Sequence, residues 1–196
     1  MNTEKQNTGK IIVIDNFLED IVFDELQKLM VGPDLPWHLG EKLDWTNQPP
    51  TLGEWEEKKD NVAKYNYQLF HIFHKHVEGE TTQSDFFEKL QPFVKKIGIF
   101  SLYRLRATFN HRTENPLLLG GYHTDLEEKY KKLNVYTGIF YCNSNNGYTS
   151  FLNGAKVSNV ANRFVSFPCD LMHSAVSCTD EQYRIQLNVN YVRDIY

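Results

Sequence analysis

Three side chains, His123, Asp125 and His173, have the types and the order that suit a single metal ion. His123 and Asp125 stand two positions apart, so on a β-strand both point to one face and both reach one cation. His173 would supply the third ligand from a distant strand. Two imidazoles and a carboxylate leave half of an octahedral sphere open, which suits Fe(II) that binds a bidentate co-substrate and then O2. Zinc accepts the same donors, so ligand type alone does not select iron.

Arg184 follows the second histidine and narrows the choice of chemistry. Residues 177–181 are typical of a turn, so we expect the strands of His173 and Arg184 to form a hairpin. Arg184 would then lie near the level of His173 on the neighbouring strand. A guanidinium pairs bidentately with a carboxylate, so it would hold the far end of a dicarboxylate whose near end chelates the metal. A zinc hydrolase has no need of such a group.

The last predicted strand, residues 183–192, alternates strictly between apolar and polar side chains. The ordinary interpretation of such a strand is that its polar face meets water. An arginine with three amides is an unusual solvent face, because Asn is a poor strand former. The pattern therefore favours a strand that lines a polar cavity. Its polar side chains are Arg184, Gln186, Asn188 and Asn190.

The order His123-x-Asp125, His173, Arg184, with Asn-x-Asn-Tyr closing the last strand, resembles the 2-oxoglutarate- and Fe(II)-dependent oxygenases. Within them the chain looks closest to the prolyl 4-hydroxylase-like branch, including small phage and bacterial members. The similarity covers residues 101–192. It implies a double-stranded β-helix (a jelly roll, cupin-like) with the metal triad at its open end. It also implies Fe(II), 2-oxoglutarate as co-substrate, O2 and optional ascorbate, with succinate and CO2 as products.

The same resemblance assigns the co-substrate contacts. The arginine would bind the distal carboxylate of 2-oxoglutarate, and Tyr141 matches the family's tyrosine that hydrogen-bonds that carboxylate. A further tyrosine often lies on the strand before the His-x-Asp motif, but Phe109 stands near that position here and has no hydroxyl. Asn110 or Tyr103 from the same strand would compensate. Asn188 on the last strand would add a polar contact to the co-substrate.

The elements that must position these residues change character near residue 98. Before it, a β-rich run at 10–14 leads to an amphipathic helix over 17–30, and a helix over 84–97 holds Pro92, which predicts a kink or two pieces. After it, the hydrophobic period becomes two. Strands are predicted at 99–109, 122–125, 135–142, 148–152, 155–160, 163–167, 173–176 and 183–192.

These elements predict a mainly β protein with flanking helices (α+β). Strands this short and evenly spaced favour a closed or double-sheet β architecture. We expect residues 1–196 to form a single domain, in which the strand and helices of 10–98 pack on a jelly-roll core of 99–194.

Two N-terminal segments have more than one interpretation. Residues 34–60 hold all three tryptophans and are expected to form an irregular surface connection, with a substrate-facing lid as the alternative. A strand is predicted over 65–73. His71, His74 and His76 are a candidate metal cluster, but a solvated loop after a strand end is the favoured interpretation, because no second ligand group follows at a zinc-site spacing.

Charge and cysteine content limit the partners and the compartment. The net charge is −4, the isoelectric point is about 6.0 and no Lys/Arg stripe occurs, which argues against nucleic acid as an obligatory partner. Three cysteines without a CxxC motif, and a polar start without an apolar signal core, predict a reduced, cytoplasmic protein. No apolar run approaches the roughly 18 residues needed to cross a bilayer.

The sequence therefore predicts an enzyme, a dioxygenase that hydroxylates a prolyl residue of a protein or peptide, or free proline. The main alternative is 2-oxoglutarate-dependent oxidation of another amino acid, a small metabolite or an alkylated base. A non-catalytic cupin-like protein that binds a metal or a sugar is the alternative outside the enzymes, but it would not need all four motif residues. An all-β domain with incidental histidines would require several coincidences of spacing.

Overall fold

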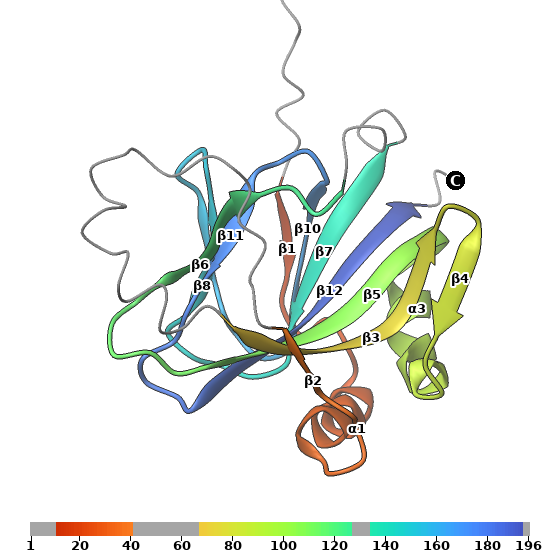
Figure 1. Cartoon of the computed structure of the whole chain (residues 1–196), viewed down its shortest axis with the longest axis horizontal. Coiled ribbons are helices and arrows are strands. Elements are labelled where there is room, and N and C mark those ends of the chain that lie inside the picture. The colour runs from red at the N-terminus through yellow and green to blue at the C-terminus, as the bar shows by residue number, and fades with distance from the viewer. Residues whose placement is uncertain (1–10, 41–66, 127–133, 194–196) are drawn as a thin grey trace, which may run out of the picture.

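The computed structural model describes residues 11–40, 67–126 and 134–193, and these fold into two facing β-sheets with helices on one side (Figure 1). The larger sheet contains β1 (Ile12–Ile14), β2 (His38–Gly40), β3 (Gln68–Val77), β4 (Glu80–Gln83), β5 (Ile99–His111), β7 (Val135–Tyr141), β10 (Arg163–Pro168) and β12 (Tyr183–Arg193). The smaller sheet contains β6 (Leu118–His123), β8 (Tyr148–Phe151), β9 (Lys156–Ser158) and β11 (His173–Val176). The helices are α1 (Asp20–Val31), the 3-10 helix η1 (Phe87–Leu90) and α3 (Gln91–Ile97).

The strand order places β12 in the middle of the larger sheet. That order is β1-β10-β7-β12-β5-β3-β2, with β4 paired to β3, and the order in the smaller sheet is β6-β11-β8-β9. All of the pairings are antiparallel. The N-terminal strands β1, β2 and β3 therefore extend the same sheet that carries the predicted polar strand.

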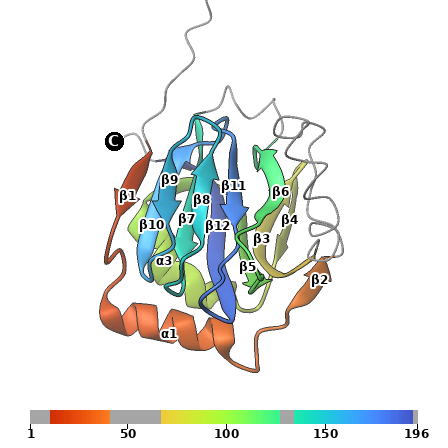
Figure 2. The same cartoon turned by 90° about the vertical axis from the view of Figure 1, so that its left-hand side faces the viewer.

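The larger sheet lies between the helices and the smaller sheet. In Figure 2, seen from the side of the smaller sheet, α3 lies behind the larger sheet and α1 crosses below both. Leu187, Val189 and Tyr191 of β12 belong to the hydrophobic core shared with Met30 of α1 and Phe93 of α3. The intervening residues of β12 are polar and also buried. Because successive side chains of a strand alternate, they face the smaller sheet.

The helix predicted over 84–97 is two pieces, as Pro92 indicated. The 3-10 helix η1 ends at Leu90, and Pro92 lies in the first turn of α3, where its missing N–H costs no intrahelical hydrogen bond. Gly98 ends α3 in a left-handed conformation with φ of 72°, which glycine adopts without strain. The division and the C-terminal end of the covering helix were thus predicted correctly, whereas the helical part begins at Phe87 and not at residue 84.

The predicted hairpin between the strands of His173 and Arg184 is wrong. β11 pairs with β6 and β8 in the smaller sheet, whereas β12 pairs with β5 and β7 in the larger sheet. Both edges of each strand are thus occupied by other partners, and the chain after Val176 crosses from one sheet to the other. Arg184 consequently faces the smaller sheet rather than lying beside His173.

The strand predicted at 122–125 is also misplaced. β6 spans Leu118–His123, so the strand begins four residues before the predicted one, and Asp125 follows its end. The two glycines in the middle of β6 hid its strand character. Asp125 is therefore positioned by the turn after β6 and by its hydrogen bonds, not by strand alternation.

The favoured loop interpretation of the histidine cluster is contradicted, because β3 continues to Val77 and contains all three residues. His71 is buried, with its ring nitrogens 2.7 Å from Pro36 O and 2.9 Å from Ser84 Oγ. His74 and His76 have hydrogen bonds to Leu102 O and Thr81 Oγ1. The cluster is structural, and burial lowers the pKa of His71.

The segment predicted as irregular over 34–60 is described only as far as residue 40. Within that part, β2 pairs with β3, and the Trp37 ring packs edge-on against Phe109 at 5.8 Å. Trp45 and Trp55, and with them most of the lid hypothesis, lie outside the described residues. The three cysteines are buried, with no disulfide in the described ranges. None of the described helices is long and apolar enough to cross a membrane.

Candidate metal centre

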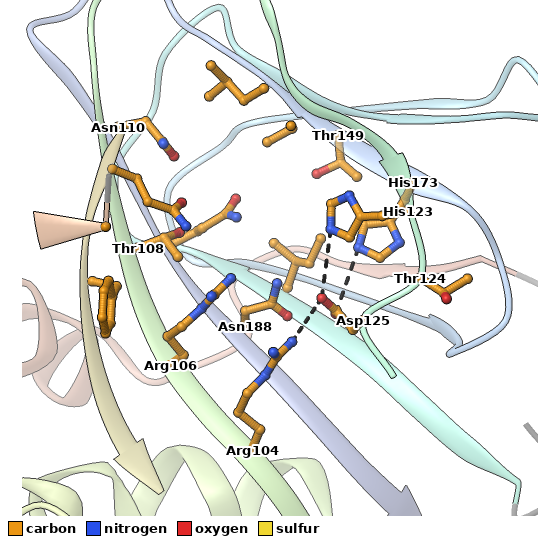
Figure 3. Close-up of a pocket in the computed structure, with 18 residues that line it drawn as sticks. Arg104, Arg106, Thr108, Asn110, His123, Thr124, Asp125, Thr149, His173 and Asn188 are labelled. Atoms are coloured by element: carbon orange, nitrogen blue, oxygen red, sulfur yellow. Dashed lines mark hydrogen bonds and ion pairs between the residues drawn. The ribbon is translucent and has the colours of Figure 1, made fainter. Parts of the chain in front are cut away.

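The structure brings His123, Asp125 and His173 together at one end of the smaller sheet (Figure 3). His123 of β6 lies directly opposite His173 of β11 in the strand register. The potential ligand atoms of the three residues all lie within 4.8 Å of one another. The two Nε2 atoms lie 3.9 Å and 3.8 Å from the Asp125 carboxylate oxygens. One cation can be reached by all three side chains.

Both imidazoles are held in the same way by the backbone. Nδ1 of His123 lies 3.0 Å from Gly121 O, and Nδ1 of His173 lies 3.1 Å from Leu171 O. A carbonyl oxygen only accepts, so Nδ1 carries the proton and donates it, and Nε2 presents its lone pair toward Asp125. Gly120 and Gly121, with φ of 73° and 69°, form a local backbone that other residues would adopt only with strain.

Asp125 is fixed by donors from the larger sheet. Arg104 Nη2 donates to its Oδ1 at 2.9 Å, and Asn190 Nδ2 donates to its Oδ2 at 3.1 Å. Arg104 Nε also donates to Asn190 Oδ1, and Asn190 Nδ2 lies 3.1 Å from Thr137 Oγ1. The carboxylate is therefore oriented by a small network that spans the two sheets.

The protonation states match those of a metal-binding set. Burial favours the neutral form of Asp125, but the positive field led by Arg104 outweighs it and holds the pKa well below its usual range. Burial is also the largest influence on His173, whose pKa it lowers to about 4. At neutral pH the carboxylate is ionised and the His173 ring is neutral, as metal ligation requires.

A ladder of polar pairs crosses the cavity face of the larger sheet. The pairs between β12 and β5 are Arg184 with Asn110, Gln186 with Thr108, Asn188 with Arg106 and Asn190 with Arg104. Except for Arg184 and Asn190, these residues line a cavity of about 290 Å³ whose wall also includes the His-Asp-His cluster (Figure 3). The predicted polar cavity along the last strand is confirmed.

The far end of the ladder holds a buried cation. Arg184 is 0% exposed, and its three guanidinium nitrogens have no hydrogen-bond partner in the part of the chain that is described. Its guanidinium carbon lies 5.6 Å from the centroid of the Tyr141 ring. Buried charges are normally paired, because removing them from water is costly. The site therefore fits an anion that enters through the cavity and pairs with Arg184.

The other predicted co-substrate contacts fall at different depths. Tyr141 lies below the cavity wall, and its hydroxyl is 2.7 Å from Oγ1 of Thr149, which does line the cavity. Burial raises the pKa of Tyr141, so the phenol stays protonated. Asn110 and Asn188 line the cavity, whereas Tyr103 is not among the lining residues. Phe109 packs in the core against Tyr183.

Sequence reasoning missed the arginines of β5. Arg104 and Arg106 share the cavity face with Thr108 and Asn110, and the pattern Arg-x-Arg-x-Thr-x-Asn mirrors the polar face of β12. That second alternating polar face was a readable signal. Its meaning depended on the pairing of β5 with β12, which periodicity alone does not give.

The donor set fits Fe(II) with a chelating dicarboxylate, as does the buried Arg184, for which the described residues supply no hydrogen-bond partner. Two imidazoles and one carboxylate would leave coordination positions facing the cavity. A zinc site for hydrolysis would leave Arg184 without a role. The arrangement therefore has a candidate ligand cluster at one end and a deeply buried guanidinium at the other.

Comparison with solved structures gives the fold. An oxidoreductase of the 2OG-Fe(II) oxygenase family from Burkholderia pseudomallei aligns with a TM-score of 0.60 at 10% identity, over 94% of this chain and 86% of that one. The non-heme alpha-ketoglutarate-dependent epimerase SnoN from nogalamycin biosynthesis aligns with a TM-score of 0.58 at 10% identity, over 94% of this chain and 78% of that one. A prolyl hydroxylase from Trichoplax adhaerens, in complex with a hypoxia inducible factor peptide fragment, aligns with a TM-score of 0.56 at 12% identity, over 95% of this chain and 84% of that one.

These likenesses confirm the predicted jelly-roll fold, here with two open sheets rather than a closed barrel. They also confirm, for the fold, the resemblance to 2-oxoglutarate oxygenases and prolyl hydroxylases. No protein-family model and no curated protein sequence matches the chain.

Proposed function

We propose that this chain is an Fe(II)- and 2-oxoglutarate-dependent dioxygenase, with residues 1–196 acting as one oxygenase domain. The observation that carries the proposal is Arg184, a fully buried arginine without a hydrogen-bond partner among the described residues. It lies at one end of a polar ladder whose other end reaches the His123, Asp125 and His173 cluster. A dicarboxylate bound at both ends would satisfy this geometry.

In this proposal His123, Asp125 and His173 hold the metal, and Arg184 pairs with the distal carboxylate of 2-oxoglutarate. Tyr141 packs its ring against the guanidinium and, through Thr149, places a hydroxyl in the cavity wall. Oε1 of Gln186 and Oδ1 of Asn188 are buried without hydrogen-bond partners within the described ranges, and they become satisfied when a polar ligand fills the cavity.

The reaction would couple two oxidations. Fe(II) supplies the activation of O2, one oxygen atom entering succinate as 2-oxoglutarate loses CO2 and the other entering the substrate as a hydroxyl. The chain's own part is positional. Arg104 and Asn190 fix Asp125, and the carbonyls of Gly121 and Leu171 fix the imidazoles.

The proposed substrate is a prolyl residue of a protein or peptide, or free proline. The support is the resemblance of the motif and the fold likeness to the prolyl hydroxylase that is bound to a peptide. The likeness to an epimerase shows that the same fold serves other reactions, so the substrate assignment needs its own test. Nucleic acid is not proposed as a partner, and a reduced, cytoplasmic setting is proposed from the cysteines.

The test is an anaerobic titration of Fe(II)-loaded protein with 2-oxoglutarate, followed by admission of O2 and an assay of succinate. We expect a weak visible charge-transfer band on titration and slow succinate formation without substrate. Asp125→Asn should remove metal binding, and Arg184→Met should keep metal binding while removing the band. Arg163→Gln is the matched control, because Arg163 pairs with Asp15 outside this cavity. Metal uptake by the wild type with neither band nor succinate would instead support a cupin-like binding protein.

A further inference from the structure

Thr108 of β5 carries a hydroxyl for which the described residues supply no hydrogen-bond partner. The residue is 2% exposed and lines the cavity, and in Figure 3 it lies between Asn110 and Arg106. A buried hydroxyl without a partner is unfavourable, because it has given up its hydrogen bonds to water and gained none. No role proposed above involves Thr108. Its hydroxyl is therefore a candidate contact for a ligand.

Thr108 belongs to a row of side chains that crosses the larger sheet. It is paired with Gln186 of β12, and Gln186 is paired on its other side with Tyr141 of β7. Residues directly opposite each other on antiparallel strands point to the same face, with Cβ atoms about 4.5–5.5 Å apart. Tyr141, Gln186 and Thr108 therefore lie side by side on the face toward the smaller sheet.

The guanidinium of Arg184 lies beside this row. Arg184 itself is in the neighbouring rung, opposite Asn110, but its guanidinium carbon is 5.6 Å from the centroid of the Tyr141 ring. The hydroxyl of Tyr141 is in turn 2.7 Å from Oγ1 of Thr149, which lines the cavity. The buried cation and the Thr108 row thus meet at the same end of the cavity.

This end of the cavity is separated from the metal ligands. Asp125 is held by Arg104 and Asn190, which form the rung two places beyond that of Thr108. Residues four apart along a strand, such as Arg104 and Thr108, lie about 13 Å apart. The Thr108 hydroxyl is thus placed for the distal end of a ligand, and not for the end that chelates a metal.

The distal group of 2-oxoglutarate has the chemistry that both side chains require. It is a carboxylate, whose two oxygens only accept hydrogen bonds. One carboxylate can accept from the guanidinium of Arg184 and from the hydroxyl of Thr108 together, and hydrogen bonds to a charged acceptor are the stronger ones. An acid that chelates a metal but has no distal carboxylate would leave both of these donors without a partner.

On the basis of the proposed function, we infer that Thr108 donates a hydrogen bond to the distal carboxylate of 2-oxoglutarate and helps the site to select this dicarboxylate over shorter chelating acids. Thr108 is then a specificity-determining residue for the co-substrate. Thr108→Val keeps the shape of the side chain and removes only the hydroxyl donor, so it isolates this contribution.

The experiment compares 2-oxoglutarate with oxalate, which chelates a metal but has no distal carboxylate, on the full chain loaded with Mn(II). Thermal unfolding gives the half-saturating concentration of each acid. In Thr108→Val we expect that of 2-oxoglutarate to rise about tenfold or more, as loss of a hydrogen bond to a charged group predicts, and that of oxalate to stay the same. Thr108→Ser, which keeps a hydroxyl, should retain most of the affinity. Thr82→Val, at an exposed position on β4, is the matched control.

Stability without ligand separates a binding role from a structural one. Because the described residues supply no partner for the hydroxyl, Thr108→Val should leave the urea midpoint of the ligand-free protein unchanged or raise it. Unchanged binding of 2-oxoglutarate in this variant, an equal loss for both acids, or a marked loss of stability without ligand would each overturn the inference. Failure of the wild type to bind Mn(II) or 2-oxoglutarate, which is measured first, would instead refute the proposed function.

Discussion

Arg104 of the larger sheet donates from Nη2 to Oδ1 of Asp125 at 2.9 Å, across the gap between the two sheets. The contact gives the carboxylate a fixed orientation and keeps it ionised despite its burial, with only 3% of the side chain exposed. The same arginine donates from Nε to Asn190, which is the other donor to Asp125. Asp125 therefore depends on β5 and β12, although it follows β6 in the chain.

Replacement of Arg104 by Gln should weaken metal binding by about 10- to 100-fold, the usual cost of removing a partner of a metal ligand. The variant leaves Asp125 with one of its two donors. The affinity for Mn(II) can be measured by titration under anaerobic conditions. Arg112→Gln, at an exposed arginine just beyond β5, should bind Mn(II) as the wild type does. An unchanged affinity in Arg104→Gln would show that the contact does not position the ligand.

Replacement of Arg184 by Met should abolish stabilisation by 2-oxoglutarate while the unfolding free energy of the ligand-free protein stays the same or rises. Arg184 is a buried cation without a hydrogen-bond partner among the described residues, and replacing such a group by an apolar side chain is often neutral or favourable. In the Mn(II)-loaded wild type, 2-oxoglutarate at 100 times its dissociation constant should raise the free energy of unfolding by about 2.7 kcal/mol. Denaturant unfolding with and without 2-oxoglutarate checks both parts. A large loss of stability in the ligand-free variant would mean that Arg184 has a structural partner.

Gly147 lies behind Arg184, and Gly147→Ala should raise the concentration of 2-oxoglutarate that is required. A Cβ there would lie 2.8 Å from Asn145 Oδ1, 2.9 Å from Val176 O and 3.1 Å from Arg184 Cδ. The local backbone or the Asn145 side chain must therefore shift, and the arginine side chain must move by a few tenths of an ångström. Such overpacking costs about 1–3 kcal/mol of stability. Metal affinity should not change, because the ligand cluster is at the other end of the ladder. The readouts are the 2-oxoglutarate titration and the Mn(II) titration on the same variant.

Gly138→Ala is the control for this prediction. Its Cβ would lie 2.7 Å from Val189 and 2.8 Å from the Phe164 ring, both in the core beneath the helices. It should lower the unfolding free energy by a similar amount without changing the 2-oxoglutarate requirement. If both glycine variants raise that requirement equally, the effect of Gly147→Ala is general destabilisation and not a shift of Arg184.

The metal-free protein should lose stability as the pH falls from about 6.5 toward 4. Burial lowers the pKa of His173 to about 4 and also lowers that of His71, whereas both titrate near 6.5 in the unfolded chain. Within this window the unfolded state binds more protons than the folded state, so acid favours unfolding. Urea midpoints at several pH values test this. His71→Gln should reduce the dependence of the urea midpoint on pH. His76→Gln, at a position near the end of β3, should leave that dependence unchanged. The same pH dependence in the wild type and both variants would contradict the prediction.

Period-two patterning was sufficient to locate most strands from the sequence, because each short strand buries one or both faces and is bounded by turn residues. β8, β10, β11 and β12 lie where the alternation placed them, and Pro92 correctly divided the covering helix. The glycines of β6 and the histidines of β3 misled the prediction, since neither residue type is typical of a strand. In both cases, partners on neighbouring strands outweighed local propensity.

The candidate ligands could be predicted because metal chemistry restricts residue types, whereas their supports could not. The predicted hairpin was wrong because a turn signal shows that the chain changes direction and does not say which sheet it joins. The importance of Arg104 follows only from the pairing of β5 with β12. The contact of Tyr141 could not be predicted for the same reason, because its hydroxyl bonds to Thr149 on a strand of the other sheet.

The central place of β12 has a consequence for synthesis on the ribosome. β12 is made after both of its neighbours, β5 and β7, and inserts between them. Until residues 183–193 have emerged from the ribosome, β5 and β7 each expose an unpaired strand edge. During that interval the nascent chain is prone to aggregate through these edges. A premature stop between residues 174 and 182 would leave a product with His123, Asp125 and His173 all present but without the strand that joins the two halves of the larger sheet. Such fragments are expected to be cleared by proteolysis rather than to retain partial activity.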